Sequence, residues 1–206
     1  MTTVLITGFG RFPGAPSNPT AALAARLART GRRRGLTCVA HVFATTYAAV
    51  DRELPALISA HRPDAIVMLG LAARRRHVSI EVFARNRVSS WFPDASGMVP
   101  PRAVIAAGAA ASTRGRVEFS RLLAAARATR VKTMLSRDAG NYLCNYVYWR
   151  ALEAAASPGG PRRVVFVHVP RVGRAFRQRG ATQQRQFTFD QFLRVGAAIL
   201  AAISRR

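Results

Sequence analysis

Residues 64–70 read DAIVMLG, a continuous apolar run that follows one aspartate and stops at a glycine. Strands covered by helices on both faces have this character, because neither face meets water. Similar apolar runs occupy residues 4–7 and 164–169. Helix-forming stretches separate the apolar runs, at residues 21–30, 47–60, 119–130, 142–156 and 189–204. This alternation predicts an α/β fold, a single three-layer α/β/α domain over residues 1–206 with a mainly parallel twisted sheet.

Weaker signals fill the intervals between these elements. We expect further strands at residues 37–43, 78–84 and 132–136, where β-branched and apolar residues gather. Residues 88–101 are rich in Ser, Pro and Gly and predict a long loop. Residues 171–186 are basic and weakly patterned, which predicts a basic loop.

The composition is that of a globular protein, since 50% of the residues are hydrophobic and Gly and Pro are spread along the chain. The longest apolar stretch near the C-terminus, residues 195–203, is too short to cross a bilayer, and no signal-peptide pattern opens the chain. The two cysteines, Cys38 and Cys144, are expected to be free thiols in a reducing compartment. The sequence therefore predicts a cytoplasmic protein without a membrane partner.

A formal net charge of +23 comes almost entirely from arginine, because Lys132 is the only lysine. Arginine clusters such as residues 32–34 and 74–76 could neutralise phosphates, which makes nucleic acid one candidate partner. Joint enrichment of Arg and Ala by genome composition would instead spread solvated arginines over the whole surface. We favour this second explanation, since the clusters are dispersed along the chain and few aromatic residues lie among them.

Cys144 and His168 are candidates for nucleophilic catalysis. Cys144 falls in the first turn of the helix predicted over residues 142–156, where backbone N–H groups and the helix dipole favour a thiolate. His168 lies near the end of the strand predicted over residues 164–169, and α/β folds gather functional groups at the carboxyl ends of strands. By spacing alone, a small buried cysteine and a core histidine are the preferred explanations of these two residues.

Glu81 is one of nine acidic residues, and it interrupts an otherwise apolar predicted strand. A carboxylate in that setting needs a partner. One alternative is a structural ion pair with Arg75 or Arg85. The other is His168, because a carboxylate that fixes the tautomer of an imidazole leaves its second nitrogen free to take a proton from a thiol. The sequence leaves both alternatives open.

Four segments resemble the pyroglutamyl peptidase I family of cysteine peptidases. They are ITGFGRFPGAPSNPT at residues 6–20, LGLAARRRHVSIEVFARN at 69–86, DAGNYLCNYVYWRAL at 138–152 and VFVHVP at 165–170. The cysteine segment is the most specific, and the resemblance runs in register from Val4 to about Ile203. Cys144, His168 and Glu81 fall at the family's three catalytic positions.

The resemblance implies a hydrolase, a thiol protease that removes an amino-terminal pyroglutamyl residue from a peptide whose N-terminus is thereby blocked. Cys144 is the implied nucleophile, His168 the general base and Glu81 the group that orients the histidine. Phe9 and Phe12 are similar to the family's aromatic pair that packs on the lactam ring.

Other implications concern the loop, the assembly and the cofactors. Asn18 matches the asparagine that helps to hold the first loop, although core packing explains the two phenylalanines equally well. The family's assembly is commonly a homotetramer, which makes a homo-oligomer the implied state. No cofactor is implied. A metal site is not expected either, because Cys38 and His41 have no second pair of ligands near them in the sequence.

The chain also departs from the family pattern. Leu71 stands where the family usually has a glutamine that hydrogen-bonds the lactam, and an unpaired lactam N–H would cost about 1 to 3 kcal/mol. Trp91 stands where the family carries an arginine near the oxyanion, and Arg87 is a candidate replacement. Further replacements lie in the first loop and after the glutamate, at Gly10, Arg11, Pro13 and Val82. A catalytically weakened or specificity-altered homologue, or a basic nucleic-acid-binding protein on the same fold, are therefore the alternatives to an active pyroglutamyl peptidase.

Overall fold

The fold is built on one six-stranded sheet with the strand order β2-β1-β3-β8-β4-β7. The structure, a computed structural model, describes residues 2–12, 16–173 and 187–205. Within this part of the chain, β2, β1, β3 and β8 are parallel, whereas β4 and β7 run the opposite way. The expected α/β class with a mainly parallel sheet is therefore confirmed.

The central strands are the apolar runs of the sequence. The strands of the sheet are β1 (Thr3–Phe9), β2 (Thr37–Phe43), β3 (Ala65–Leu71), β4 (Val78–Glu81), β7 (Thr133–Ser136) and β8 (Arg163–Val169). β3 and β8 lie side by side at the centre, and every residue of β3 except Leu71 is buried. This burial on both faces explains why these segments lack the alternation of a half-exposed strand.

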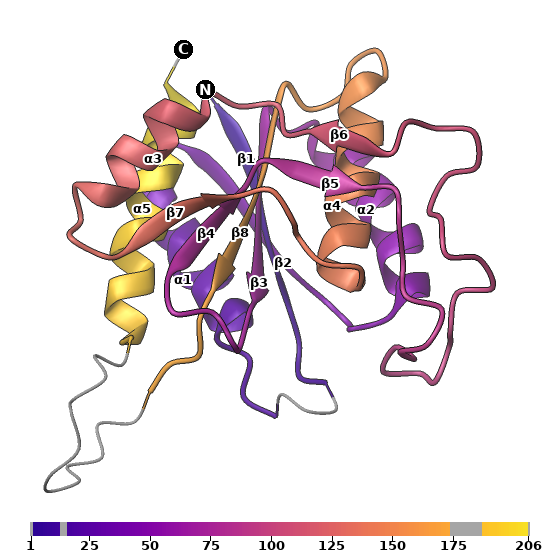
Figure 1. Cartoon of the computed structure of the whole chain (residues 1–206). Coiled ribbons are helices and arrows are strands. Elements are labelled where there is room, and N and C mark those ends of the chain that lie inside the picture. Colours follow the sequence, from indigo (N-terminus) through magenta and orange to yellow (C-terminus); the bar gives the residue numbers. More distant parts are fainter. Residues whose placement is uncertain (1, 13–15, 174–186, 206) are drawn as a thin grey trace, which may run out of the picture.

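Helices cover both faces of the sheet (Figure 1). The helices are α1 (Pro19–Arg32), α2 (Tyr47–His61), α3 (Phe119–Arg127), α4 (Leu143–Ala156) and α5 (Phe189–Ser204). α1, α3 and α5 pack over one face, and α2 and α4 over the other, so that each face has its own apolar core. The three-layer arrangement is thus confirmed. None of the helices in the described ranges has the length and apolarity needed to span a membrane.

The strand predicted over residues 78–84 is wrong in its extent, because the chain leaves the sheet after Glu81. Val82 donates a backbone hydrogen bond to Ser136 on β7, and β5 (Phe83–Arg85) then pairs with β6 (Ser112–Arg114) in a separate two-stranded ribbon. The apolar pattern continues through this break, so no local signal in the sequence marks it. β6 was not predicted at all.

Other boundaries differ by a few residues. The helix predicted over residues 119–130 ends at Arg127, and Arg130 has a left-handed φ of 61°. The predicted loop at residues 88–101 contains no helix or strand. Most of the predicted basic loop, residues 174–186, lies outside the described residues, as does Pro13.

Candidate active site

Three neighbouring strands place Gly70, His168 and Glu81 on the same face of the sheet. Gly70 on β3 pairs with His168 on β8, and His168 pairs in turn with Ser79 on β4, two residues before Glu81. Because side chains alternate along a strand, Ser79 and Glu81 point to the same side. This is the face that α4 covers.

Cys144 reaches this face from the first turn of α4, which begins at Leu143. Gly140, with a φ of 91°, supplies the left-handed turn that leads the chain from β7 into the helix. A Cβ atom at Gly70 would lie 2.8 Å from Sγ of Cys144 and 2.7 Å from Cζ of Phe166. The close approach of the thiol to the sheet therefore depends on a residue without a side chain at position 70.

Glu81 has both kinds of partner that the sequence allowed, an arginine and a histidine. The arginine is Arg75 and not Arg85, and the histidine is His168. Oε1 of Glu81 lies 2.7 Å from Nδ1 of His168 and 2.5 Å from Nη1 of Arg75. The Glu81 side chain is fully buried, and the hydroxyl of Tyr148 on α4 donates to its backbone carbonyl at 2.9 Å. One carboxylate oxygen thus holds an imidazole and a guanidinium, and a side chain of the cysteine-bearing helix holds the strand.

The protonation of Cys144 differs from the expectation. Burial raises the pKa of the Cys144 thiol to about 12, and the negative charge of Glu81 acts in the same direction. The charge of Arg75 and the backbone N–H of Cys144 lower this pKa, but by less. The helix start therefore acts in the predicted direction, while desolvation outweighs it and favours the neutral thiol in the free protein.

The raised pKa of Cys144 sets the pH dependence of its alkylation. Only the thiolate reacts with iodoacetamide, and below the pKa its population grows about tenfold for each pH unit. We expect Cys144 to be alkylated slowly at neutral pH, with a rate that rises steadily up to about pH 10. Mass spectrometry of the modified peptide measures this rate, and Cys144→Ser, which retains only Cys38, is the control. A rate that is already constant near neutral pH would instead indicate a preformed thiolate.

A cavity of about 210 Å³ opens in front of Cys144 and His168. All four predicted substrate-binding residues line it, and Glu81 lies behind His168 outside the lining. The lining residues are Phe9, Phe12, Asn18, Thr45, Leu71, Ala139, Gly140, Asn141, Tyr142, Leu143, Cys144 and His168. The structure therefore gathers at one cavity residues from five separate segments of the sequence.

Asn18 joins the first loop to helix α1. Its side-chain nitrogen donates to the carbonyl of Gly10 at 3.0 Å, and its Oδ1 accepts from the backbone N–H of Thr20 at 3.1 Å as the helix N-cap. Thr45 also contacts the loop, through its hydroxyl and the carbonyls of Gly10 and Arg11. Sequence reasoning missed Thr45, for which no motif gave a signal, and Tyr142, which lies two residues before the cysteine within the quoted segment.

Trp91 and Arg87 do not line the cavity. Trp91 is 86% exposed, and its backbone N–H is held by Oγ of Ser89 at 3.2 Å. Nη2 of Arg87 donates to both carboxylate oxygens of Asp138, at 2.9 and 2.8 Å. Neither side chain is placed to donate to an oxyanion at Cys144 in this conformation.

Other features of the described residues lie apart from this cavity. A larger groove of about 670 Å³ between α2 and α4 has no candidate catalytic residue in its lining. Cys38 and Cys144 are free thiols, and His41 bonds Glu53 at 2.9 Å. No group of three or more His, Cys, Asp and Glu side chains that could hold a metal ion occurs in the described ranges.

Comparison with known proteins gives one consistent result. Residues 2–205 match the family described as pyroglutamyl peptidase. The pyrrolidone-carboxylate peptidase of Thermococcus kodakarensis is 30% identical over 167 residues, which cover 81% of this chain and 80% of that protein. The enzyme of the same name from Cupriavidus necator is 30% identical over 209 residues, which cover 100% of this chain and 95% of that protein.

Solved structures show the same architecture. A mutant pyrrolidone carboxyl peptidase from Pyrococcus furiosus superposes with a TM-score of 0.85 at 25% identity and covers 98% of both chains. The fold is also that of the pyroglutamyl peptidase I from Bacillus amyloliquefaciens, with a TM-score of 0.86 over 100% of this chain and 96% of that chain at 23% identity. The match over nearly the whole sequence places this chain in the pyroglutamyl peptidase family of cysteine peptidases.

Proposed function

We propose that this protein removes the amino-terminal pyroglutamyl residue from peptides, with Cys144 as nucleophile, His168 as general base and Glu81 as the orienting carboxylate. The observation that carries the proposal is the 2.7 Å bond between Glu81 and Nδ1 of His168 at a cavity that His168 shares with Cys144. With Nδ1 engaged by Glu81, Nε2 is the nitrogen left to accept a proton. Family membership supports the same three residues.

Each step follows from these positions. His168 takes the proton of the neutral Cys144 thiol as the sulfur attacks the carbonyl that joins pyroglutamate to the next residue. The backbone N–H of Cys144, in the first turn of α4, is a donor for the resulting oxyanion. His168 then protonates the leaving amine, the tetrahedral intermediate collapses to a thioester, and the shortened peptide departs. Water, deprotonated by His168, hydrolyses the thioester and restores the thiol.

The raised thiol pKa supports proton transfer during the attack instead of an ion pair formed beforehand. When His168 becomes an imidazolium, the carboxylate of Glu81 stabilises its charge. The guanidinium of Arg75 lies 2.5 Å from the same carboxylate and holds it in its buried position beside His168. Arg75 is a positioning residue in this mechanism.

The cavity suits a small, flat and largely apolar group such as the pyroglutamyl ring. Phe9 and Phe12 provide aromatic surface in the lining of the cavity. Asn18 and Thr45 provide polar side chains there. Leu71 also lines the cavity and offers no hydrogen bond to the lactam. Recognition therefore rests on shape and on polar groups other than residue 71.

Replacing Leu71 with glutamine tests this account of recognition. Leu71 is the last residue of β3 and is partly exposed to the cavity, so Leu71→Gln adds an amide where the lactam is expected. One additional hydrogen bond should raise kcat/KM for pyroglutamyl-coumarin by about fivefold to tenfold, mainly through KM. Leu71→Met, which keeps an apolar side chain, is the control. An unchanged or lower kcat/KM for Leu71→Gln alone would place the lactam elsewhere.

The basic test of the function is the hydrolysis of pyroglutamyl-coumarin by the purified wild-type chain. A set of N-acetylated and N-formylated dipeptides measures whether another blocked terminus is preferred. Turnover of pyroglutamyl substrates, with none of the N-acetylated or N-formylated dipeptides, supports the proposal. A preference for another blocked residue would indicate the specificity-altered homologue.

The location and assembly are part of the proposal. A cytoplasmic location agrees with two free thiols. A homotetramer rests on the family resemblance, and light scattering of the purified protein tests it, with the mass of one chain as the contradicting result.

A further inference from the structure

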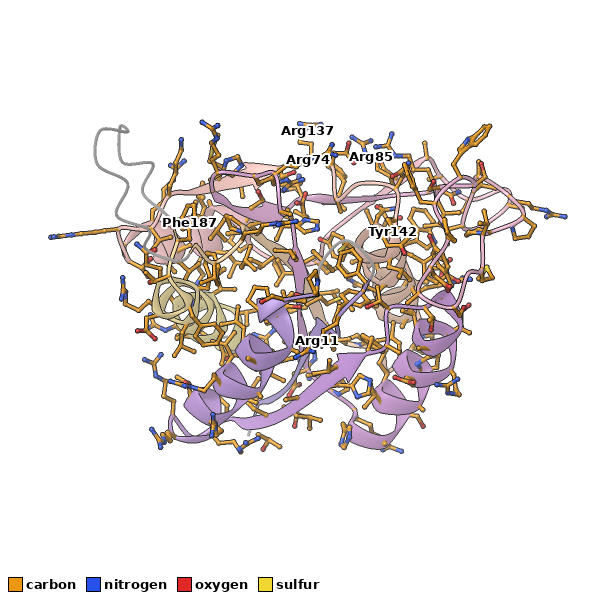
Figure 2. The ribbon with its side chains drawn as sticks, turned by 90° about the horizontal axis from the view of Figure 1, so that it is seen from below. Arg11, Arg74, Arg85, Arg137, Tyr142 and Phe187 are labelled. Atoms are coloured by element: carbon orange, nitrogen blue, oxygen red, sulfur yellow. The ribbon has the colours of Figure 1, made fainter. Side chains whose placement is uncertain are left out.

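A group of arginines includes Arg137, which lies two residues before Ala139 in the lining of the active-site cavity. Arg85 ends β5 and Arg137 directly follows β7, and Nη2 of Arg85 donates to the carbonyl of Arg137 at 3.0 Å. Arg74, in the connection between β3 and β4, lies at the same margin of the face in Figure 2, which is seen from below Figure 1. Tyr142 and Arg11 both lie nearer the centre of this view. We call Arg74, Arg85 and Arg137 the arginine rim.

Aromatic and backbone contacts hold two of the rim arginines, Arg85 and Arg137, in place. The guanidinium carbons of Arg85 and Arg137 lie over the ring of Phe83, at 5.6 and 5.1 Å from its centroid. Two cations share one ring here, although like charges repel each other. Such an arrangement differs from arginines dispersed in solvent, because the fold brings the two charges together.

Nearby carboxylates do not neutralise the rim. Glu81 is bonded to Arg75 and His168, and Asp138 is bonded to Arg87. In the residues that the structure describes, none of the three rim arginines forms an ion pair with a carboxylate. The rim is therefore a concentration of positive charge that an acidic ligand would complement.

The connection from the rim to the cavity is direct. Nη2 of Arg75 donates to the carbonyl of Asp138 at 2.7 Å, which joins the loop that carries Arg74 to the residue after Arg137. The next residues, 139–144, form one wall of the cavity. Arg137 of the rim and the nucleophile Cys144 thus lie at the two ends of one short segment, residues 137–144.

The chemistry fixes where the leaving peptide begins. His168 must protonate the leaving amine, so the chain beyond the scissile bond starts beside His168. Ala72, at the start of the loop that carries Arg74, donates to the carbonyl of Val169 next to His168 at 2.9 Å. Three residues of extended peptide cover roughly 10 Å, so the side chains at the second and third positions after the bond lie outside a cavity of about 210 Å³.

From these contacts, and resting on the function proposed above, we infer that the substrates are pyroglutamyl peptides with acidic side chains at the second and third positions after the scissile bond. The arginine rim receives these carboxylates. The cavity reads the pyroglutamyl group, and the rim selects among the peptides that carry it.

The test compares pyroglutamyl-Ala-Glu-Glu-Ala amide with the corresponding Gln-Gln and Lys-Lys peptides. We expect kcat/KM for the acidic peptide to exceed that for the Gln-Gln peptide by about tenfold at low salt, with the Lys-Lys peptide slowest. The difference should shrink at about 0.5 M salt, where exposed charges are screened. Chromatography of the released pyroglutamate measures all three rates.

Variants assign the preference to the rim. The triple variant Arg74→Gln/Arg85→Gln/Arg137→Gln should lose the preference, and the triple lysine variant should retain most of it. Arg26→Gln/Arg29→Gln/Arg33→Gln, which removes the same charge from exposed positions in and just after α1, is the matched control and should keep it. Arg74→Gln alone, at an exposed loop residue, should reduce the preference even if the triple variant is unstable.

The outcomes separate this inference from the proposed function. Failure of the wild type to cleave any pyroglutamyl substrate overturns both. If the wild type cleaves pyroglutamyl-coumarin but cleaves the three peptides at similar rates, only the inference is overturned. Inhibition by a short DNA duplex, with loss of inhibition in the rim variant but not in the control, would assign the rim to nucleic acid and would also overturn it.

Discussion

Cys144→Ser is expected to abolish the hydrolysis of pyroglutamyl-coumarin, with a loss of about 10⁴-fold or more in kcat/KM. A serine hydroxyl is a far weaker acid than a thiol, so His168 in a site arranged around sulfur would deprotonate it much less readily. Ser is close to Cys in size, so the first turn of α4 and its contact with Gly70 should persist. A fluorogenic assay gives the rate, and circular dichroism with a melting curve establishes that the variant is folded.

Cys38→Ala is the matched control for Cys144→Ser. Cys38 is the other free thiol, buried against Gly31 on the opposite face of the sheet. This variant should keep activity within about twofold of wild type while losing some stability, because a buried sulfur is removed. Substantial activity in folded Cys144→Ser, above about one hundredth of wild type, would remove Cys144 from the nucleophile's role.

Glu81→Gln is expected to lower kcat by about 10³- to 10⁴-fold. The glutamine keeps the size of the side chain and still offers an oxygen to Nδ1 of His168. It cannot stabilise the imidazolium that forms when Cys144 attacks. It also leaves the guanidinium of Arg75 without its carboxylate, close to that developing positive charge. The loss should appear in kcat more than in KM, since Glu81 lies outside the cavity lining.

The chain contains a natural control for Glu81→Gln. Glu53 bonds His41 at 2.9 Å in a second Glu–His pair, whose side chains are 25% exposed and lie outside the candidate cavity. Glu53→Gln changes the same chemistry elsewhere and should leave the rate within about twofold, as expected for a surface pair. The size of the loss in kcat distinguishes a carboxylate that orients His168 from one that is only a structural partner of Arg75. If Glu81→Gln is folded and loses less than about tenfold in kcat, the carboxylate is only a structural partner of Arg75.

The arginine excess has two explanations, genome composition and the binding of an acidic ligand, and each can apply to different arginines of the structure. Genome composition is one explanation for arginines that are exposed to solvent, such as Arg26 and Arg29 on α1. It does not explain the placement of Arg85 and Arg137 over the ring of Phe83. A compositional bias can supply the residues, while the fold decides which of them meet a substrate.

Some expectations failed because they depended on neighbours distant in the sequence. The strand predicted over residues 78–84 is broken because Val82 bonds β7 and Phe83 pairs with Arg114 on β6. The thiolate predicted for Cys144 is disfavoured because burial raises the pKa of its thiol to about 12. Arg87, the candidate replacement for the oxyanion arginine, is paired with Asp138 and does not line the cavity.

The amino-acid sequence by itself determined the fold class and the family. Buried central strands must be apolar on both faces, so runs such as residues 64–70 predict a parallel sheet between helices without any knowledge of contacts. The segments around Glu81, Cys144 and His168 are short contiguous motifs, so the family can be identified from them without a structure.

Only the tertiary structure decided what these residues meet. The register between β8 and β4 sets Glu81 beside His168, and the missing side chain at Gly70 lets the sulfur of Cys144 approach the same face. The charge of Glu81, the proton of Cys144 and the arginine rim all depend on distances between segments that are far apart along the chain. Electrostatic energies vary with distance and solvent exposure, and neither quantity is encoded in any single segment.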